Sequence, residues 1–346
     1  MTTDSNGLPK SFKVLPPVAN PRIPRLIDLC LDTIVKNFTP DTDISQIPRK
    51  YHRQILSRIP TDIDLITAVM AIPDGEYWKR RTLDAFPRLS YDPARKTWKR
   101  LFIENYAVQQ LEQATDETLD DVLKELKIIG PFVSSLTLER TPSKVTVMQL
   151  FRNFRTLRNL RLVYGEPHRS FAKYEEFNDF TVAPENGATV KDCQLIGMDF
   201  AALGKKCSLQ EFDMSDNSLD DKSAEFIAKG LYQLRSLTVL RFAYNTMKKS
   251  GAHALATVMV NNPVRILDLS HNQIGSEGTN LVAGIAKLAP MLKELNLSGN
   301  RIGNKGIIFI ALMLKETKSL EKLDISANNI SNFGDLIDAI HENTTL

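Results

Sequence analysis

Five asparagines recur in the second half of the 346-residue sequence at an almost constant interval. Each closes a segment of the same type, of which "LKELNLSGNRI", starting at Leu292, is one example. The asparagines are separated by 28, 27, 28 and 28 positions and are Asn217, Asn245, Asn272, Asn300 and Asn328. A repeat this regular restricts the chain to an architecture in which one structural unit stacks upon the next.

The residues inside each segment predict a short strand, a turn and then a helix. In the example, Leu292, Leu295 and Leu297 alternate with polar residues, as they do when one face of a strand is buried. The asparagine that follows can bond backbone groups that the turn would otherwise bury without a partner, so we expect an asparagine ladder. Apolar residues at helical spacing, such as Ile307 and Ile310, come next.

This pattern is that of the leucine-rich repeat, and a period near 28 with a full helix resembles the ribonuclease-inhibitor class. We therefore predict an α/β fold, a leucine-rich-repeat solenoid shaped as a horseshoe, over residues 131–346. Weaker copies of the repeat start at Val133, Leu157 and Val190, and an insertion loop is expected at about 164–189. Because Leu346 stands where another strand would start, we expect an open C-terminal end, continued by further chain or covered by a partner.

Residues 22–130 predict a helical module that caps the solenoid. Segments such as "RLIDLCLDTIVKNF" and "DETLDDVLKELKII" carry apolar residues three and four positions apart. Residues 1–21 are polar and rich in proline, and we expect them to form an extended arm.

Charge is concentrated in one stretch, residues 77–100, although the whole chain carries only +3. That stretch has eight basic and two acidic residues, which gives +6. Lys96, Lys99 and Arg100 form a candidate basic patch for an acidic surface such as that of tubulin. The alternative is a solvated helix face whose long side chains cover apolar groups.

The outward-facing residue near the end of each predicted strand supplies a second candidate surface. Basic members come early and acidic members late along this row, which suits protein recognition by complementary charge. Besides Thr137 and Gln194, the row contains the candidate partner-binding residues Arg161, Asp213, Arg241, Asp268, Asn296 and Asp324.

Catalytic and cofactor motifs are not found in the sequence. There is no phosphate-binding loop, the five histidines are scattered, and the three cysteines lack the spacing of a metal site. We therefore expect no enzyme, no cofactor and no metal, and a reducing compartment. No apolar stretch is long enough for a membrane helix, and nothing indicates nucleic-acid binding.

The segment "IPRKYHRQILSRIPTDIDLITAVMAIPDGEYWKR", residues 47–80, together with the repeats that follow, resembles a known family. It is similar to the leucine-rich-repeat subunit 5 family of the axonemal nexin–dynein regulatory complex, the T-complex-associated testis-expressed family. This resemblance implies a structural subunit that links doublet microtubules and regulates dynein in cilia and flagella. It also implies a cytoplasmic and cytoskeletal location in the axoneme, and a hetero-oligomeric assembly with other subunits of the complex and with tubulin or doublet-microtubule proteins.

Two other functions stay open at this point. The same segment also resembles an F-box, which would make the chain a substrate receptor of a ubiquitin ligase, although Tyr51 and His52 stand where leucines are usual. The third candidate is a leucine-rich-repeat GTPase regulator, which would need a catalytic arginine at a rim position such as Arg241 or Arg301.

Overall fold

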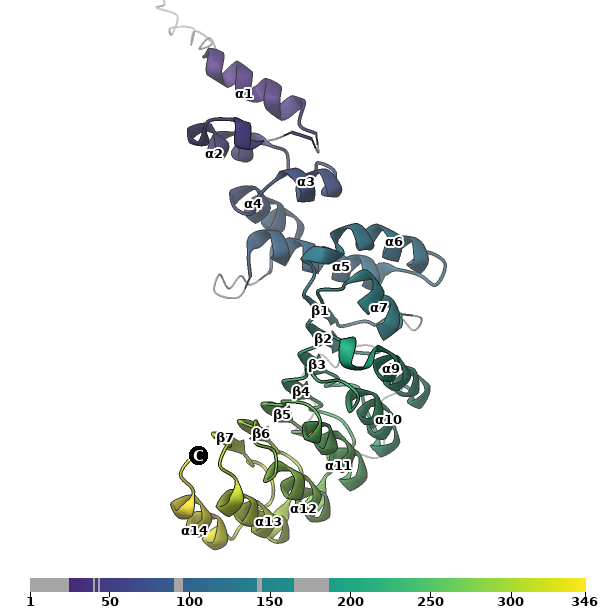
Figure 1. The fold of residues 1–346 in the computed structure, drawn as a ribbon, viewed down its shortest axis with the longest axis vertical. Coiled ribbons are helices and arrows are strands. Elements are labelled where there is room, and N and C mark those ends of the chain that lie inside the picture. The colour runs from purple at the N-terminus through teal and green to yellow at the C-terminus, as the bar shows by residue number, and fades with distance from the viewer. Residues whose placement is uncertain (1–24, 40, 43, 90–95, 142–144, 165–186) are drawn as a thin grey trace, which may run out of the picture. The chain divides into compact units, whose positions relative to one another are not determined.

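A computed structural model describes residues 25–39, 41–42, 44–89, 96–141, 145–164 and 187–346. The chain divides into two compact units, Met1–Leu89 and Ser90–Leu346. Figure 1 colours the described elements in chain order. The extended arm expected at 1–21 lies outside the described residues, as does most of the insertion loop expected at 164–189.

The first unit is helical. Its elements are α1 (Leu26–Lys36), the short 3-10 helix η1 (Ile44–Gln46), α2 (Arg49–Arg58), α3 (Leu65–Ala71) and α4 (Glu76–Ala85). Trp78 is fully buried, and its indole Nε1 donates a hydrogen bond to the Ile72 carbonyl at 3.2 Å. Arg58 of α2 forms ion pairs with Asp28 and Asp32 of α1, so charge as well as apolar packing joins these two helices.

The second unit contains a parallel sheet of seven strands in the order β1 to β7. Figure 1 shows the strands along one side of the stack and α9 to α14 along the other. The elements are α5 (Trp98–Gln113), α6 (Leu119–Ile129), η2 (Gly130–Phe132), β1 (Ser135–Leu138), α7 (Val147–Asn153), β2 (Asn159–Leu162), α9 (Val190–Leu203), η3 (Gly204–Lys206), β3 (Glu211–Asp213), α10 (Asp221–Leu231), β4 (Val239–Arg241), α11 (Lys249–Thr257), η4 (Val258–Val260), β5 (Ile266–Asp268), α12 (Gly275–Ala286), β6 (Glu294–Asn296), α13 (Gly303–Glu316), β7 (Lys322–Asp324) and α14 (Gly334–Glu342).

From β1 to β6, the strand register stacks one apolar residue per strand in the space between the sheet and the helices. Each of these residues is at least 99% buried, and burying such a side chain fully stabilises the fold by about 1.5–3 kcal/mol. They are Leu136, Leu160, Phe212, Leu240, Leu267 and Leu295. The alternation seen in the sequence therefore places the apolar set inward on successive strands.

The five repeated asparagines lie side by side behind the strands and bond from one repeat to the next. In the case of Asn245, Oδ1 accepts from the N–H groups of Asn217 and Leu219 at 3.1 and 2.9 Å. Its Nδ2 donates to the Met214 carbonyl and to two carbonyls of its own turn. The other four asparagines make bonds of the same kind. This arrangement is the ladder expected from their spacing.

The division between the two units falls at Leu89, whereas the sequence-based module extends to residue 130. The reason is that α5 packs on β1 and joins the repeat unit. Glu104 of α5 accepts from the N–H groups of Ser134 and Ser135, both at 2.9 Å. Glu112, two turns later, accepts from two N–H groups just after the strand. Helix α5 thus supplies acceptors to the first strand, where there is no preceding repeat.

The prediction of a weak repeat strand starting at Val190 is wrong, because residues 190–203 form helix α9. Thr189 and Asp192 cap this helix with reciprocal hydrogen bonds, in which each side chain accepts from the other's backbone N–H. Cys193 and Phe200 lie on its buried side at helical spacing. Strand β3 consequently pairs directly with β2, and Gln194 lies on a helix and not in the strand row.

A single residue, Asn217, holds the chain on both sides of residues 165–186. Its Oδ1 accepts from the Tyr164 N–H at 2.8 Å, and its carbonyl accepts from the Ala188 N–H at 3.2 Å. A Cβ atom at Gly187 would lie 2.7 Å from the same carbonyl, so this close approach requires glycine.

Candidate protein-binding surface

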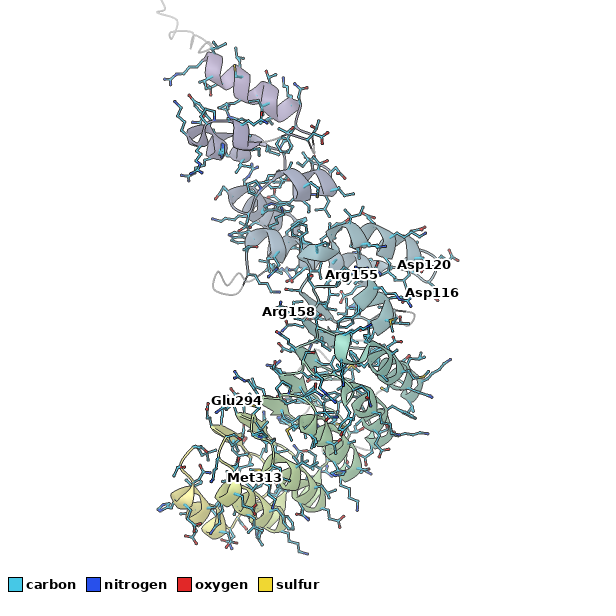
Figure 2. The ribbon with its side chains drawn as sticks, viewed as in Figure 1. Asp116, Asp120, Arg155, Arg158, Glu294 and Met313 are labelled. Carbon is cyan, nitrogen blue, oxygen red and sulfur yellow. The ribbon has the colours of Figure 1, made fainter. Side chains whose placement is uncertain are left out.

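The structure brings the predicted row of strand residues together on one face of the sheet, where Asp213 is buried and the others are partly exposed. Each member is the register partner of the next, in the order Arg161, Asp213, Arg241, Asp268, Asn296 and Asp324. In Figure 2, Arg158 and Glu294 mark the strand side of the stack, whereas Met313 lies among the helices.

The early part of the row is internally neutralised. Arg161 forms ion pairs with Asp213 at 2.7 Å and with Asp216 at 3.2 Å. Burial alone would lower the pKa of Arg161, but the attraction of these two carboxylates raises it overall. Arg241 pairs with Glu211, while burial lowers the pKa of Arg241. The two arginines expected to face a partner are therefore already engaged by carboxylates of this chain.

The late part of the row is acidic. Asp268, Asn296 and Asp324 each accept, through Oδ1, the N–H of the residue two positions later at 3.0 Å, which fixes their side chains. The hydrogen bonds from Ser326 lower the pKa of Asp324. Within the described part of the chain, neither aspartate forms an ion pair, so this half of the face presents negative charge.

An aromatic pair borders the row and was not predicted from the sequence. The rings of Tyr244 and His271 stack with centroids 4.2 Å apart and an angle of 7° between their planes. Both residues directly precede a ladder asparagine and have left-handed backbones, with φ of 54° and 52°. At the next repeat the same position is Gly299, where a Cβ atom would meet His271 Nδ1 at 2.8 Å. The position before each ladder asparagine is the sequence signal that identifies this rim.

We expect His271 to make the folded state less stable in acid. Burial lowers its pKa below the ordinary 6.5, although Asp268 and Asp324 act in the opposite direction. The unfolded chain therefore binds the proton more readily, so the free energy of unfolding falls as the pH drops through about 6.5 and levels off below the folded pKa. His271→Phe preserves the stacking and removes the titration.

Urea unfolding at several pH values between neutral and mildly acidic tests this expectation. The variant should lose less stability on acidification than the wild type. Equal losses in the two proteins would show that His271 does not contribute to the pH dependence.

Part of the candidate basic patch makes contacts within the protein that stabilise the fold. Lys96 Nζ lies 2.6 Å from Oε2 of the buried Glu104, and Lys99 Nζ lies 5.0 Å from the centre of the Phe132 ring. Arg100 is exposed on the first turn of α5. In the first unit, Arg80 donates to three carbonyls at the end of α2. The positive charge of residues 77–100 is thus divided between the two units, and Lys96 and Arg80 have internal partners.

Two properties of the described residues bear on metal binding and on membranes. Among them, no three His, Cys, Asp or Glu side chains are placed to hold a metal ion. No helix in the same part of the chain is both long and apolar enough to cross a membrane.

Comparison with known proteins agrees with the fold. The family model described as leucine-rich repeat matches residues 205–228, 260–279 and 289–311. Dynein regulatory complex subunit 5 of Mus musculus is 25% identical over 68% of this chain and 51% of its own length. The Chlamydomonas reinhardtii protein of the same name is 29% identical over 57% of this chain and 48% of its own. The chain is thus similar to dynein regulatory complex subunit 5, and part of it matches leucine-rich repeats.

The predicted solenoid and the predicted resemblance to the subunit 5 family are thereby confirmed. The chain spans about half the length of the curated subunit 5 proteins it matches. Among solved structures, the tropomodulin C-terminal domain of Caenorhabditis elegans aligns with 14% identity and a TM-score of 0.37, over 45% of this chain and 93% of that one.

Proposed function

We propose that the protein is a non-catalytic structural subunit of a nexin–dynein regulatory complex. In this role it helps to link doublet microtubules and to regulate dynein-driven motility of cilia and flagella through contacts with other proteins. The similarity to dynein regulatory complex subunit 5 over 68% of the chain is the observation that carries this proposal. The proposed location is the cytoplasm and cytoskeleton, in the axoneme.

The repeat unit suits a scaffold. The asparagine ladder and the strand register hold the exposed sheet face as one surface, and the fixed carboxylates of its late strands suit a partner with complementary positive charge. Other subunits of the complex are the proposed partners of this face, with tubulin or another doublet-microtubule protein as a further partner.

Fractionation of motile cilia tests the proposal. A tagged copy of the full chain, expressed in ciliated cells, should remain with axonemes after washing with detergent and then with salt. Recovery in the soluble fraction of every cell type would contradict the proposed function, as would stable capture of a ubiquitin-ligase adaptor or acceleration of GTP hydrolysis.

Charge reversal on the late strands tests the role of the sheet face. We expect the double variant Asp268→Lys and Asp324→Lys to bind its partner at least about tenfold more weakly, because like charges would then oppose each other across the interface. Glu117→Lys, an exposed acidic position between α5 and α6, is the control. The measurement is the fraction retained on salt-washed axonemes, with thermal unfolding to show that all variants are folded. Full retention of the double variant would show that these two carboxylates are not part of the interface.

A further inference from the structure

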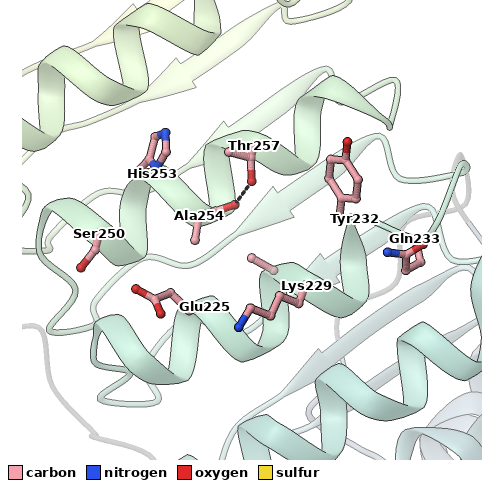
Figure 3. Close-up of a pocket in the computed structure, with 9 residues that line it drawn as sticks. Glu225, Lys229, Tyr232, Gln233, Ser250, His253, Ala254 and Thr257 are labelled. Atoms are coloured by element: carbon pink, nitrogen blue, oxygen red, sulfur yellow. Dashed lines mark hydrogen bonds between the residues drawn. The ribbon is translucent and has the colours of Figure 1, made fainter.

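The outward positions of the repeat helices can be compared one by one, because the ladder asparagines give each repeat a common origin. The residues eight positions after the asparagine are Glu225 in α10, His253 in α11, Asn280 in α12 and Ile308 in α13. The residues twelve positions after it are Lys229, Thr257, Gly284 and Leu312. Figure 3 shows the α10 and α11 members of both sets, all of them polar residues, lining a groove. Of these four helices, α13 alone has aliphatic residues at both positions. Helix α14 starts six residues after Asn328 instead of three or four, and it places Leu336, which is buried, and Ile340 at these offsets.

These two residues are exposed. Ile308 and Leu312 lie one helical turn apart and expose 45% and 53% of their surface. The helices that pack against α13 on either side add Leu281 in α12, which is 38% exposed, and Ile337 in α14, which is 51% exposed. We call Leu281, Ile308, Leu312 and Ile337 the outer apolar stripe. Figure 1 shows the three helices next to one another in the helical layer.

The sequence of α13 is unusual for a helix with one side in water. Residues 306–314, "GIIFIALML", contain no polar side chain. A helix that is apolar all round is normally covered on all sides, whereas a surface helix keeps a polar outer face. Helices α10 and α11 of this same chain have such a polar face, so the repeat does not itself require aliphatic residues there.

We propose that the outer apolar stripe binds an amphipathic helix of another protein, one that carries basic residues along the flank facing α14. Asp335 and Asp338 lie on either side of Ile337 in the sequence of α14 and are exposed. Within the described residues, neither carboxylate forms an ion pair, although both attract Lys315, which pairs with Glu342. Basic residues of the bound helix would face these two carboxylates.

The remaining charges near the stripe support this orientation. Lys287 pairs with Glu316 at 3.1 Å and Lys315 pairs with Glu342 at 2.9 Å, so the charges between α12 and α13 and between α13 and α14 are largely matched. Lys305 lies at the beginning of α13, a turn before Ile308, and favours an acidic residue of the partner there. A helix is the expected occupant because Ile308 and Leu312 form an i, i+4 ridge that fits the grooves of another helix.

This surface is separate from the proposed sheet-face interface, since it lies on the helical side of the repeats. The inference therefore goes beyond the proposed function and does not depend on which complex contains the protein. A chain that binds through both sides would join two neighbours.

Variants copied from the chain's own repeats test the stripe without disturbing the fold. Ile308→Asn introduces the residue found at the same position in α12, and Leu312→Thr introduces the one found in α11. Since those repeats are folded, we expect the double variant to have the thermal stability of the wild type. Glu225→Gln with Lys229→Gln in α10 is the matched control.

Site-specific photo-crosslinking in the full chain identifies the occupant. A benzophenone amino acid is placed at position 308, with position 225 as the control, and crosslinked peptides from cell extracts are mapped by mass spectrometry. The expected result is crosslinks from position 308 to residues three, four or seven apart in one segment rich in Lys and Arg, with a yield that falls at least about fivefold when Leu312→Thr is added.

Three results would overturn the proposal. They are crosslinks from position 308 to a second copy of this chain, crosslinks to an extended or acidic segment, and a yield no higher than that from position 225. Loss of axonemal retention with the crosslinks preserved would count against the proposed function alone. Retention on axonemes without the crosslinks would count against the stripe alone.

Discussion

Replacing Asn245 with alanine is expected to lower the free energy of unfolding by about 3–5 kcal/mol, because this side chain bonds two repeats and is almost fully buried. The substitution leaves the N–H groups of Asn217 and Leu219 without an acceptor, and it removes the donor to the Met214 carbonyl. Water has little access to these groups because they are buried. Each buried polar group without a partner costs about 1–3 kcal/mol.

The measurement is urea unfolding followed by far-ultraviolet circular dichroism. Asn280→Ala, on the exposed side of α12, replaces the same residue type outside the ladder and should change the stability by no more than about 0.5 kcal/mol. Similar small effects in both variants would mean that the ladder hydrogen bonds add little to the free energy of unfolding beyond what hydrogen bonds to water provide.

Glu104→Ala is the second substitution for which a large effect is expected, about 3 kcal/mol or more. The buried carboxylate accepts from the N–H groups of Ser134 and Ser135 and from the Ser134 hydroxyl, and it pairs with Lys96. Removing it leaves two N–H groups of the first strand without an acceptor and Lys96 without its counter-ion. The loss should be seen first at β1, as faster hydrogen exchange of its amides.

Two further variants separate the contributions of Glu104. Glu104→Gln keeps an acceptor for the strand and loses only the charge, so it should be less destabilising than alanine. Glu117→Ala, an exposed change in the same unit, should be nearly neutral. If glutamine and alanine were equally destabilising, the charge and not the hydrogen bonds would dominate at this site.

The repeat half of the fold follows from the sequence because its information is local and periodic. The interval between the asparagines fixes the ladder, and the alternation around residues such as Leu295 fixes which side of each strand is buried. The stretch from Val190 was mistaken for a strand, because its short apolar alternation fits either structure. This stretch forms a helix because Thr189 and Asp192 cap it with hydrogen bonds and because its buried residues have helical spacing.

The candidate surface was less predictable, since pairing between charges depends on contacts far apart in the chain. Arg161 meets Asp213 across 52 positions, and no periodicity in the sequence indicates that these two strands are neighbours. Lys96 belongs to a conspicuously basic stretch, yet its partner is a buried glutamate whose role emerges only when α5 packs on β1. The outer apolar stripe is visible from the sequence only after the repeats have been aligned on their asparagines.

The double attachment at Asn217 has a consequence for protein engineering and for divergence among relatives. Tyr164 and Ala188 are held to one residue, so the number of amino acids between them is decoupled from the spacing of the solenoid. The entropic cost of a longer connection rises only with the logarithm of its length once its two ends are fixed. This point of the chain is therefore suited to accept a fluorescent domain or an affinity tag while the stack on either side keeps its geometry.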